Sequence, residues 1–243
     1  MLECQIETYH RMKVDDVVVI KGFLADKINI AGVRYYVNPS YADTNMLFSL
    51  FCAESEIAGD VILSYADILF QDSVLQALLD APPHDISVVV DTQWEEYYRQ
   101  RFENPFEEAE SLIYDSDGRI LEIGESHPSP SNIQAQYIGL IRLSERGSMI
   151  FREAYNHARK KFWDRPWQRG KIFQEAYMTD FLQALINEGV PLHAVTIQHG
   201  WLEFDTVTDY ENVLAWYASD ALDRFCSLDS LRRRGQVITT SLR

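Results

Sequence analysis

Acidic side chains at the ends of hydrophobic segments are the residues of this chain best suited to chemistry. Asp67 follows V-I-L-S-Y-A and Asp91 ends I-S-V-V-V-D, so each acid closes a segment with the composition of a buried strand. In parallel α/β sheets, ligands bind outside the carboxyl ends of the strands. A carboxylate at such an end either caps the next helix or binds a ligand, and spacing alone leaves both readings open.

A second acidic group lies in the segment W-L-E-F-D-T-V-T-D-Y. Glu203 and Asp205 are two residues apart, so an extended backbone would turn both toward one face. Neighbouring carboxylates repel each other unless a cation or hydrogen-bond donors lie between them. Mg²⁺ binds one or two carboxylates and completes its shell with water and phosphate oxygens. Asp67 and Asp205, supported by Glu203, would form such a site; a solvated acidic pair is the open alternative.

These acids are carried by alternating strand-like and helix-like segments. β-branched or aromatic runs predict strands that start at Val17, Arg34, Val61 and Ile86. Apolar residues at helical spacing predict helices over 1–13, from Asn45 to Glu54 and over 73–79. This β-α-β order predicts an α/β fold with a mostly parallel sheet that is covered by helices on both faces.

The middle of the chain lacks this alternation of strands and helices, and the second half resumes it. Asp117-Gly118 predicts a hairpin over 110–124, and H-P-S-P-S-N predicts a loop over 127–132. Further on we expect strands from Gln136 and His193, helices over 145–161 and 174–188, and a last helix that carries Asp209.

Composition bounds the class of protein. The chain has 243 residues, a formal net charge of -15, 47% hydrophobic residues and three widely spaced cysteines. These values predict one α/β domain over 1–231 with a basic tail over 232–243, in a reduced, cytoplasmic protein. The acidic balance argues against a nucleic-acid partner. No apolar run reaches the roughly 20 residues of a membrane span, so we expect no membrane partner.

Five segments in order carry a resemblance to a known family: Y-A-D-T-N-M-L-F-S-L, S-Y-A-D-I-L-F, V-V-V-D-T-Q-W, A-Q-Y-I-G-L and W-L-E-F-D-T-V-T-D-Y. Over about residues 1–225 the chain resembles the sugar-nucleotidyltransferase superfamily. It is most similar to the cytidylyltransferase branch that acts on phosphocholine, phosphonates and related phospho-compounds. The resemblance implies a three-layer Rossmann-like fold with a mixed, mostly parallel sheet. Ala66 departs from the family's usual glycine.

The resemblance also implies roles for individual residues. Asp67, Glu203 and Asp205 match the acids that bind the catalytic Mg²⁺ in this family. Thr44, Asn45 and Ser49 match the nucleotide-base pocket; capping and packing of the following helix is their alternative. The positions that match the second-substrate site are Asp91, Gln136, Tyr137 and Gly139, with Asp180 on a helix over the same cleft. Gly139 could equally mark a bulge, and Asp180 a helix cap.

One basic residue is singled out by its surroundings. Arg101 follows the aromatic segment W-E-E-Y-Y, and we expect it to contact a phosphate or the second substrate. A solvated surface charge is the alternative for Arg101, as it is for Lys21, Lys27 and Arg169.

The function implied is Mg²⁺-dependent transfer of CMP from CTP to a small phosphorylated or phosphonylated acceptor, with release of pyrophosphate. The family's glycine-rich loop, which cradles the triphosphate, has no match here, because Met1 aligns just after it. The strands at Val17 and Val61 would then each lack a neighbour. Three explanations are open: a longer natural chain, a non-catalytic binding protein, or completion by the tail or by a second subunit in a homodimer.

Overall fold

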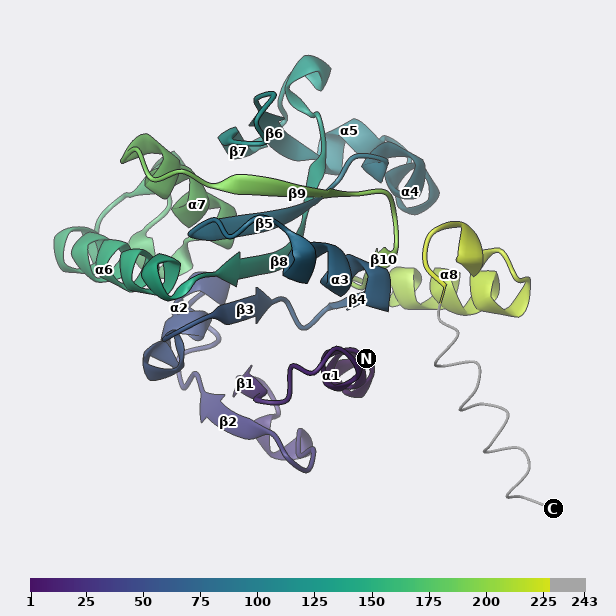
Figure 1. Cartoon of the computed structure of the whole chain (residues 1–243), viewed down its shortest axis with the longest axis horizontal. Coiled ribbons are helices and arrows are strands. Elements are labelled where there is room, and N and C mark those ends of the chain that lie inside the picture. The colour runs from purple at the N-terminus through teal and green to yellow at the C-terminus, as the bar shows by residue number, and fades with distance from the viewer. Residues whose placement is uncertain (228–243) are drawn as a thin grey trace.

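Four hydrophobic segments form the central sheet of the computed structural model, which describes residues 1–227. The strands lie in the order β3, β8, β5, β9 (Figure 1). Their bounds are Val61–Ser64 for β3, Gln136–Leu143 for β8, Ile86–Asp91 for β5 and His193–Ile197 for β9. β8 is antiparallel to both β3 and β5, whereas β5 and β9 are parallel.

The direction of β8 makes this a mixed sheet. β3, β5 and β9 share one direction, as the sequence predicted, but only one neighbouring pair is parallel. The prediction missed the reversal because β8 follows a hairpin and a loop, not the crossover helix that would have returned the chain in parallel.

Helices cover both faces of this sheet. Successive side chains of β5 point to opposite faces of the sheet, and the core is divided accordingly. Val88 and Val90 pack with one hydrophobic cluster, and Val89 packs with the other. The first cluster includes side chains of α6 (Glu145–Phe162) and α7 (Met178–Asn187). The second includes side chains of α3 (Asp72–Asp80) and α4 (Trp94–Arg101). The result is the predicted three-layer α/β arrangement.

Two further strands form a separate small sheet. β1 (Val18–Lys21) pairs in parallel with β2 (Arg34–Val37), beside the N-terminal helix α1 (Leu2–Arg11). The strand predicted from Val17 is present as β1, but its β-branched run does not lie in the core, because every residue of β1 is only half-buried. Within the described part of the chain, β1 pairs only with β2 and β3 pairs only with β8.

The remaining strands build two short ribbons. β6 (Glu110–Tyr114) and β7 (Ile120–Ser126) form the predicted hairpin, and β4 (Ile68–Phe70) pairs antiparallel with β10 (Trp201–Glu203). The other helices are α2 (Met46–Phe51), α5 (Pro105–Glu108) and α8 (Val207–Ala218). Short 3-10 helices occupy Ala25–Lys27, Glu54–Glu56, Pro130–Asn132, Gln168–Gly170, Phe173–Glu175 and Leu222–Arg224.

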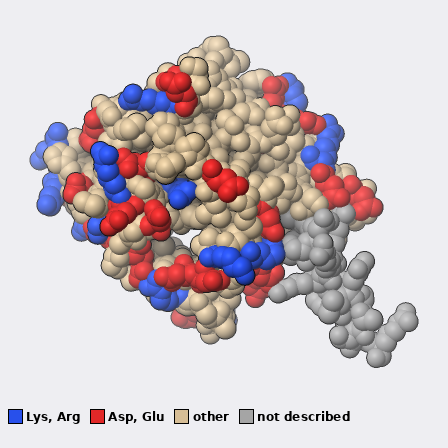
Figure 2. Space-filling view, in the orientation of Figure 1, with Lys and Arg blue, Asp and Glu red and all other residues tan. Residues whose placement is uncertain are grey.

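Two predicted helices are shorter than expected. The helix after Asn45 ends at Phe51, and the helix predicted over 174–188 begins only at Met178. The tail over 232–243 lies outside the described residues. Among residues 1–227, each helix is too short or too polar to cross a membrane. Acidic and basic side chains are interspersed over the described part of the face in Figure 2.

Candidate active site

The β4–β10 ribbon brings the two predicted acidic segments together. Asp67 lies directly before β4, and its carbonyl accepts a hydrogen bond from the Phe204 N–H across 2.9 Å. Ile68 lies opposite Glu203 in the ribbon. Residues about 135 positions apart in the sequence are therefore neighbours, and the charge of Asp205 adds to the rise in the pKa of Asp67 that burial causes.

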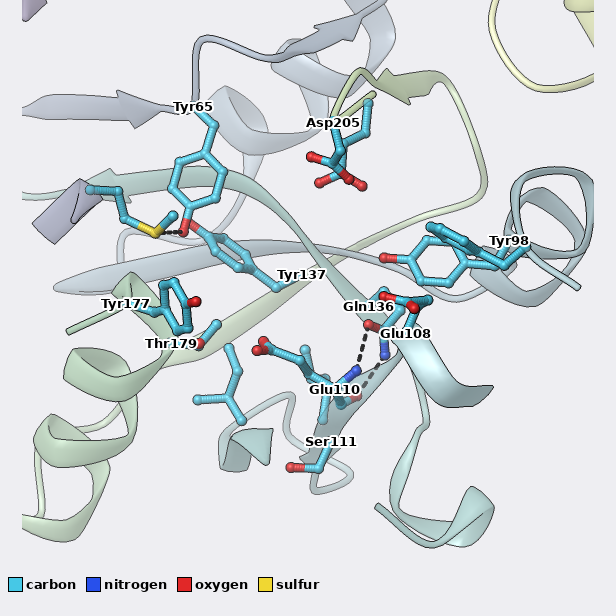
Figure 3. A pocket seen from close by; sticks show the side chains of 15 residues that line it. Tyr65, Tyr98, Glu108, Glu110, Ser111, Gln136, Tyr137, Tyr177, Thr179 and Asp205 are labelled. Carbon is cyan, nitrogen blue, oxygen red and sulfur yellow. Dashed lines mark hydrogen bonds between the residues drawn. The ribbon is translucent and has the colours of Figure 1, made fainter. Parts of the chain in front are cut away.

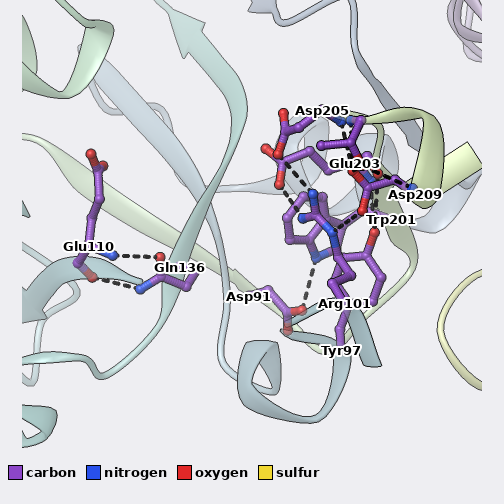
Figure 4. A network of polar contacts seen from close by, with 10 residues as sticks. Asp91, Tyr97, Arg101, Glu110, Gln136, Trp201, Glu203, Asp205 and Asp209 are labelled. Carbon is purple, nitrogen blue, oxygen red and sulfur yellow. Dashed lines mark hydrogen bonds and ion pairs between the residues drawn. The ribbon is translucent and has the colours of Figure 1, made fainter. Parts of the chain in front are cut away.

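Arg101 is the centre of an ion-pair network at this ribbon (Figure 4). Its guanidinium binds Glu203 at 2.5 Å, Asp205 at 2.8 Å and Asp209 at 2.8 Å. Only 1% of its side chain is exposed. Burial opposes the charge on Arg101, but the ion pairs outweigh burial and raise its pKa. The alternative of a solvated surface charge is therefore wrong for Arg101. The predicted contact with a phosphate or the second substrate is corrected as well, because the guanidinium binds the protein's own carboxylates and does not line the pocket described below.

The carboxylates near Arg101 differ in burial and in their hydrogen-bond partners. Burial raises the pKa of Glu203 to about 7, and Arg101 counteracts part of that rise. Tyr97 holds the backbone of Glu203, because its hydroxyl accepts a hydrogen bond from the Glu203 N–H at 3.0 Å. Asp205 is half exposed. Asp67 Oδ1 is buried, and no group of the described chain hydrogen-bonds to it.

These contacts test the predicted metal site. Within residues 1–227, no group of three or more His, Cys, Asp or Glu side chains could hold a metal ion. The three-carboxylate site of Asp67, Glu203 and Asp205 is therefore not assembled, because Arg101 binds an oxygen of Glu203 and one of Asp205. Asp67 and Asp205 still fit a hard cation: both are carboxylates, and Asp67 Oδ1 has no hydrogen-bond partner within the described chain.

A pocket of about 230 Å³ opens beside this network (Figure 3). Its lining is rich in aromatic and acidic side chains from both halves of the chain: Met46, Tyr65, Tyr98, Phe102, Glu108, Glu110, Ser111, Leu112, Ile123, Gln136, Tyr137, Tyr177, Thr179, Glu203 and Asp205. A small organic molecule could enter it and lie against Asp205.

Known proteins are similar to this chain in sequence. The CTP:phosphoglutamine cytidylyltransferase of Campylobacter jejuni is 32% identical over 225 residues, which cover 87% of this chain and 85% of that protein. The chain belongs to the nucleotidyltransferase superfamily. The choline-phosphate cytidylyltransferase of Streptococcus pneumoniae is 29% identical over 76 residues, 30% of this chain and 33% of that protein. No protein-family model matches the chain.

Solved structures show the same nucleotidyltransferase fold. The CTP:phosphocholine cytidylyltransferase from Streptococcus pneumoniae aligns with a TM-score of 0.61 at 18% identity, over 87% of this chain and 82% of that chain. The inositol-1-phosphate CTP transferase from T. maritima aligns with a TM-score of 0.65 at 14% identity, over 93% of this chain and 84% of that chain.

Two residues of the predicted second-substrate set line the pocket of this nucleotidyltransferase. Tyr137 lines it directly, and Gln136 both lines it and fixes a neighbouring strand. The Gln136 side-chain amide accepts a hydrogen bond from the Glu110 N–H at 3.1 Å and donates one to the Glu110 carbonyl at 2.7 Å. Gln136 therefore sets the position of Glu110.

Gly139 has a structural role and does not contact the pocket. Its φ is +86°, and a Cβ there would lie 2.7 Å from the ring of Tyr65. The register between β5 and β8 shifts in this region. The bulge reading is therefore confirmed: the missing side chain makes room for Tyr65, and Gly139 does not itself line the pocket.

Asp91 does not face the pocket either. Its side chain is fully buried and accepts hydrogen bonds from the Gln93 N–H at 2.8 Å, the His199 N–H at 3.0 Å and the Trp201 indole N–H at 2.9 Å. These bonds join the end of β5 to β10. The prediction of a substrate contact is corrected to a structural one, because all the donors come from the protein.

Asp180 has the capping role that its alternative described. It is fully buried, accepts from the Tyr177 N–H at 2.8 Å at the start of α7, and pairs with Arg169 at 2.6 Å. Its neighbour Thr179 lines the pocket instead.

Two of the three predicted base-pocket residues are held by one buried amide. Asn38 Nδ2 donates to Thr44 Oγ1 and to Ser49 Oγ, at 2.9 Å each. Asn45 caps α2 through a 2.8 Å hydrogen bond from the Met46 N–H. The structure brings these three polar residues together at the start of α2, where Met46 reaches the pocket lining but they do not.

Several pocket residues escaped the sequence analysis. Glu110, Tyr65 and Tyr98 line the pocket, although none was predicted to bind a ligand. A signal existed for Tyr65, which stands in the family-like segment S-Y-A-D-I-L-F. Glu110 begins a hairpin strand, and nothing local distinguishes it from the acids that precede it.

Proposed function

We propose that this protein transfers CMP from CTP to a small phosphorylated or phosphonylated acceptor, with Mg²⁺ and with release of pyrophosphate. The observation that carries the proposal is the 32% identity, over 87% of the chain, to an enzyme named CTP:phosphoglutamine cytidylyltransferase. Asp205, which lines an organic-sized pocket, and Asp67, whose carbonyl binds the Phe204 N–H beside it, support the proposal with chemistry suited to nucleotide phosphates.

In the proposed reaction an oxygen of the acceptor's phosphate attacks the α-phosphorus of CTP, and the bond to the β-phosphate oxygen breaks. Asp67 and Asp205 would hold Mg²⁺, and a bound Mg²⁺ supplies charge neutralisation at phosphate oxygens. Arg101 keeps Asp205 directed toward the pocket and limits the repulsion between Asp205 and Glu203. The aromatic lining around Tyr137 would limit the access of water to a bound acceptor, which would favour transfer to the acceptor over hydrolysis of CTP.

The base site is part of the same proposal. Thr44, Asn45 and Ser49 are our candidates for contacts to the cytosine, since hydroxyl and amide groups match the donors and acceptors of a pyrimidine edge. The second candidate function is a non-catalytic binding protein. It is favoured by one observation: within the described chain, no Lys or Arg lines the pocket.

Pyrophosphate release from CTP with a panel of phosphorylated acceptors tests the proposal. We expect Asp67→Asn and Asp205→Asn each to lower kcat about 100-fold, because each removes charge that would hold the cation. Asp60→Asn changes an exposed acid and should leave kcat unaltered. Chelation of divalent ions should abolish turnover, and added Mg²⁺ should restore it.

Two results would count against the enzyme. Turnover that ignores Asp205→Asn would refute the metal assignment. CTP binding without pyrophosphate release, for every acceptor tried, would favour the binding protein.

A further inference from the structure

The charged residues that line the pocket are all acidic. They are Glu108, Glu110, Glu203 and Asp205, and among residues 1–227 no Lys or Arg joins them. Arg101 compensates Glu203 and Asp205 at one end. In Figure 3, Glu110 lies across the pocket from Asp205, with Tyr137 between them. The Glu110 end therefore presents negative charge that the lining itself does not neutralise.

Glu110 is held in place by its backbone and points into the pocket. The Gln136 amide binds both its N–H and its carbonyl, so the backbone is fixed, and within the described chain the Thr179 hydroxyl is the polar group that acts on its carboxylate through a hydrogen bond. No Lys, Arg or His of the described chain lies within ion-pair distance of its carboxylate. Arg169 and Lys171 are the two cations whose charges lower the pKa of Glu110, and both are paired with Asp180.

Burial disfavours the charged form of this carboxylate. It raises the pKa of Glu110, and the charge of Arg169, a hydrogen bond from Thr179 and the charge of Lys171 offset only part of the rise. A buried carboxylate without a paired cation is unfavourable, and a cation supplied by a ligand would remove the cost.

The aromatic rings of the pocket already use their faces on one another or on the protein's own cations. Tyr65 and Tyr137 meet edge to face, with ring centroids 5.7 Å apart and an interplanar angle of 77°. The Lys171 ammonium lies 3.1 Å from the ring centroid of Tyr177. A quaternary ammonium is bound by the open faces of several aromatic rings, and this lining has no such cage among the described residues. The lining instead provides the carboxylate of Glu110, which can accept hydrogen bonds from a ligand.

We propose that Glu110 binds a protonated, hydrogen-bonding amine on the acceptor. The acceptor is then a zwitterion, with its phosphate toward Asp205 and its ammonium group toward Glu110. This inference rests on the proposed function for the identity of the acceptor site. It names Glu110 as a residue that determines specificity.

Equilibrium binding separates this inference from turnover. Ethanolamine phosphate, choline phosphate and 2-hydroxyethyl phosphate are of similar length and differ in the group opposite the phosphate. Titration calorimetry with the full chain, in the presence of Mg²⁺, would give the Kd of each. We expect ethanolamine phosphate to bind about tenfold more tightly than either other compound, because only its ammonium group both carries a positive charge and donates hydrogen bonds to a carboxylate.

Two variants assign the preference to one side chain. Glu110→Gln keeps the shape and removes the charge, and it should abolish the tenfold preference. Glu107→Gln removes an exposed charge three residues earlier that does not line the pocket, and it should retain the preference. Thermal unfolding of both variants checks that the fold is intact.

Equal binding of ethanolamine and 2-hydroxyethyl phosphates to the wild type would overturn the inference. Tighter binding of choline phosphate, failure of ethanolamine phosphate to bind, or a preference that survives Glu110→Gln would do the same. Failure of the proposed function looks different: no acceptor supports pyrophosphate release from CTP, while the amine preference in binding is unaffected.

Discussion

Arg101 Nε donates a hydrogen bond to Asp209 Oδ1 across 2.8 Å, and the other carboxylate oxygen of Asp209 caps α8. This one pair fixes the last residue of α4 to the first turn of α8. The two outer nitrogens of the guanidinium then bind Glu203 and Asp205. Hydrogen bonds from Arg101 and Thr206 hold the pKa of Asp209 below its usual range, although burial alone would raise it. The acids of the proposed site are thus ordered by a residue outside the pocket lining.

Replacing Arg101 should destabilise the fold. Arg101→Met leaves buried carboxylates without their partner, and we expect the free energy of unfolding to fall by about 3 kcal/mol. Urea denaturation would measure this. Arg99→Met provides the control, because its pair with Glu95 is exposed on the same helix and should contribute less than about 1 kcal/mol. Equal losses in the two variants would contradict a special role for Arg101.

Asp91→Asn should affect stability and spare ligand binding. The substitution weakens a buried carboxylate that accepts three hydrogen bonds, and we expect a loss of about 2 kcal/mol. Because Asp91 does not line the pocket, the KM for an acceptor should not change at a temperature where the variant is folded. A large rise in KM with unchanged stability would return Asp91 to the substrate site.

Gly139→Ala should cost more than the same change at an open glycine. At Gly139 the new methyl meets the Tyr65 ring in addition to the strain of a positive φ. Gly59 also has a positive φ, but a Cβ there has nothing within 4 Å. We expect about 1 kcal/mol at Gly59 and at least about 2 kcal/mol at Gly139, from thermal unfolding. A change in tyrosine fluorescence in Gly139→Ala alone would report displacement of Tyr65.

Acid should weaken the fold through His193. Burial lowers the pKa of His193, and the neighbouring His84 ring, stacked at 3.5 Å, lowers it further. The unfolded chain therefore binds a proton at His193 at a higher pH than the folded chain does. This contribution to stability is intact above about pH 7 and is lost as the pH falls through and below about 6.5.

Urea denaturation at several pH values would test the His193 assignment. His193→Gln should show a smaller loss of stability between neutral and mildly acidic pH than the wild type. The exposed His10→Gln should follow the wild type throughout. If His193→Gln and the wild type lose stability in parallel, another group is responsible.

Much of the secondary structure could be predicted because it depends on the residue types of short, contiguous segments. The run at Ile86 is apolar on both faces and forms the fully buried β5, and Asp117-Gly118 marks the hairpin turn. Asp67 and Asp205 were paired in advance from the order of family-like segments, and the ribbon of β4 and β10 brings their backbones together. Their role toward Mg²⁺ stays a prediction.

The sequence by itself determined the family, the order of the elements and the acidic residues available to a nucleotide. Only the tertiary structure decided how those residues are used. Arg101 neutralises Glu203 and Asp205, Asp91 accepts three hydrogen bonds from the protein, and Glu110 points into a pocket. The physical reason is that a carboxylate binds whichever donor lies within about 3 Å of it. Those neighbours come from segments as much as 110 residues away along the chain, so no local pattern reveals them.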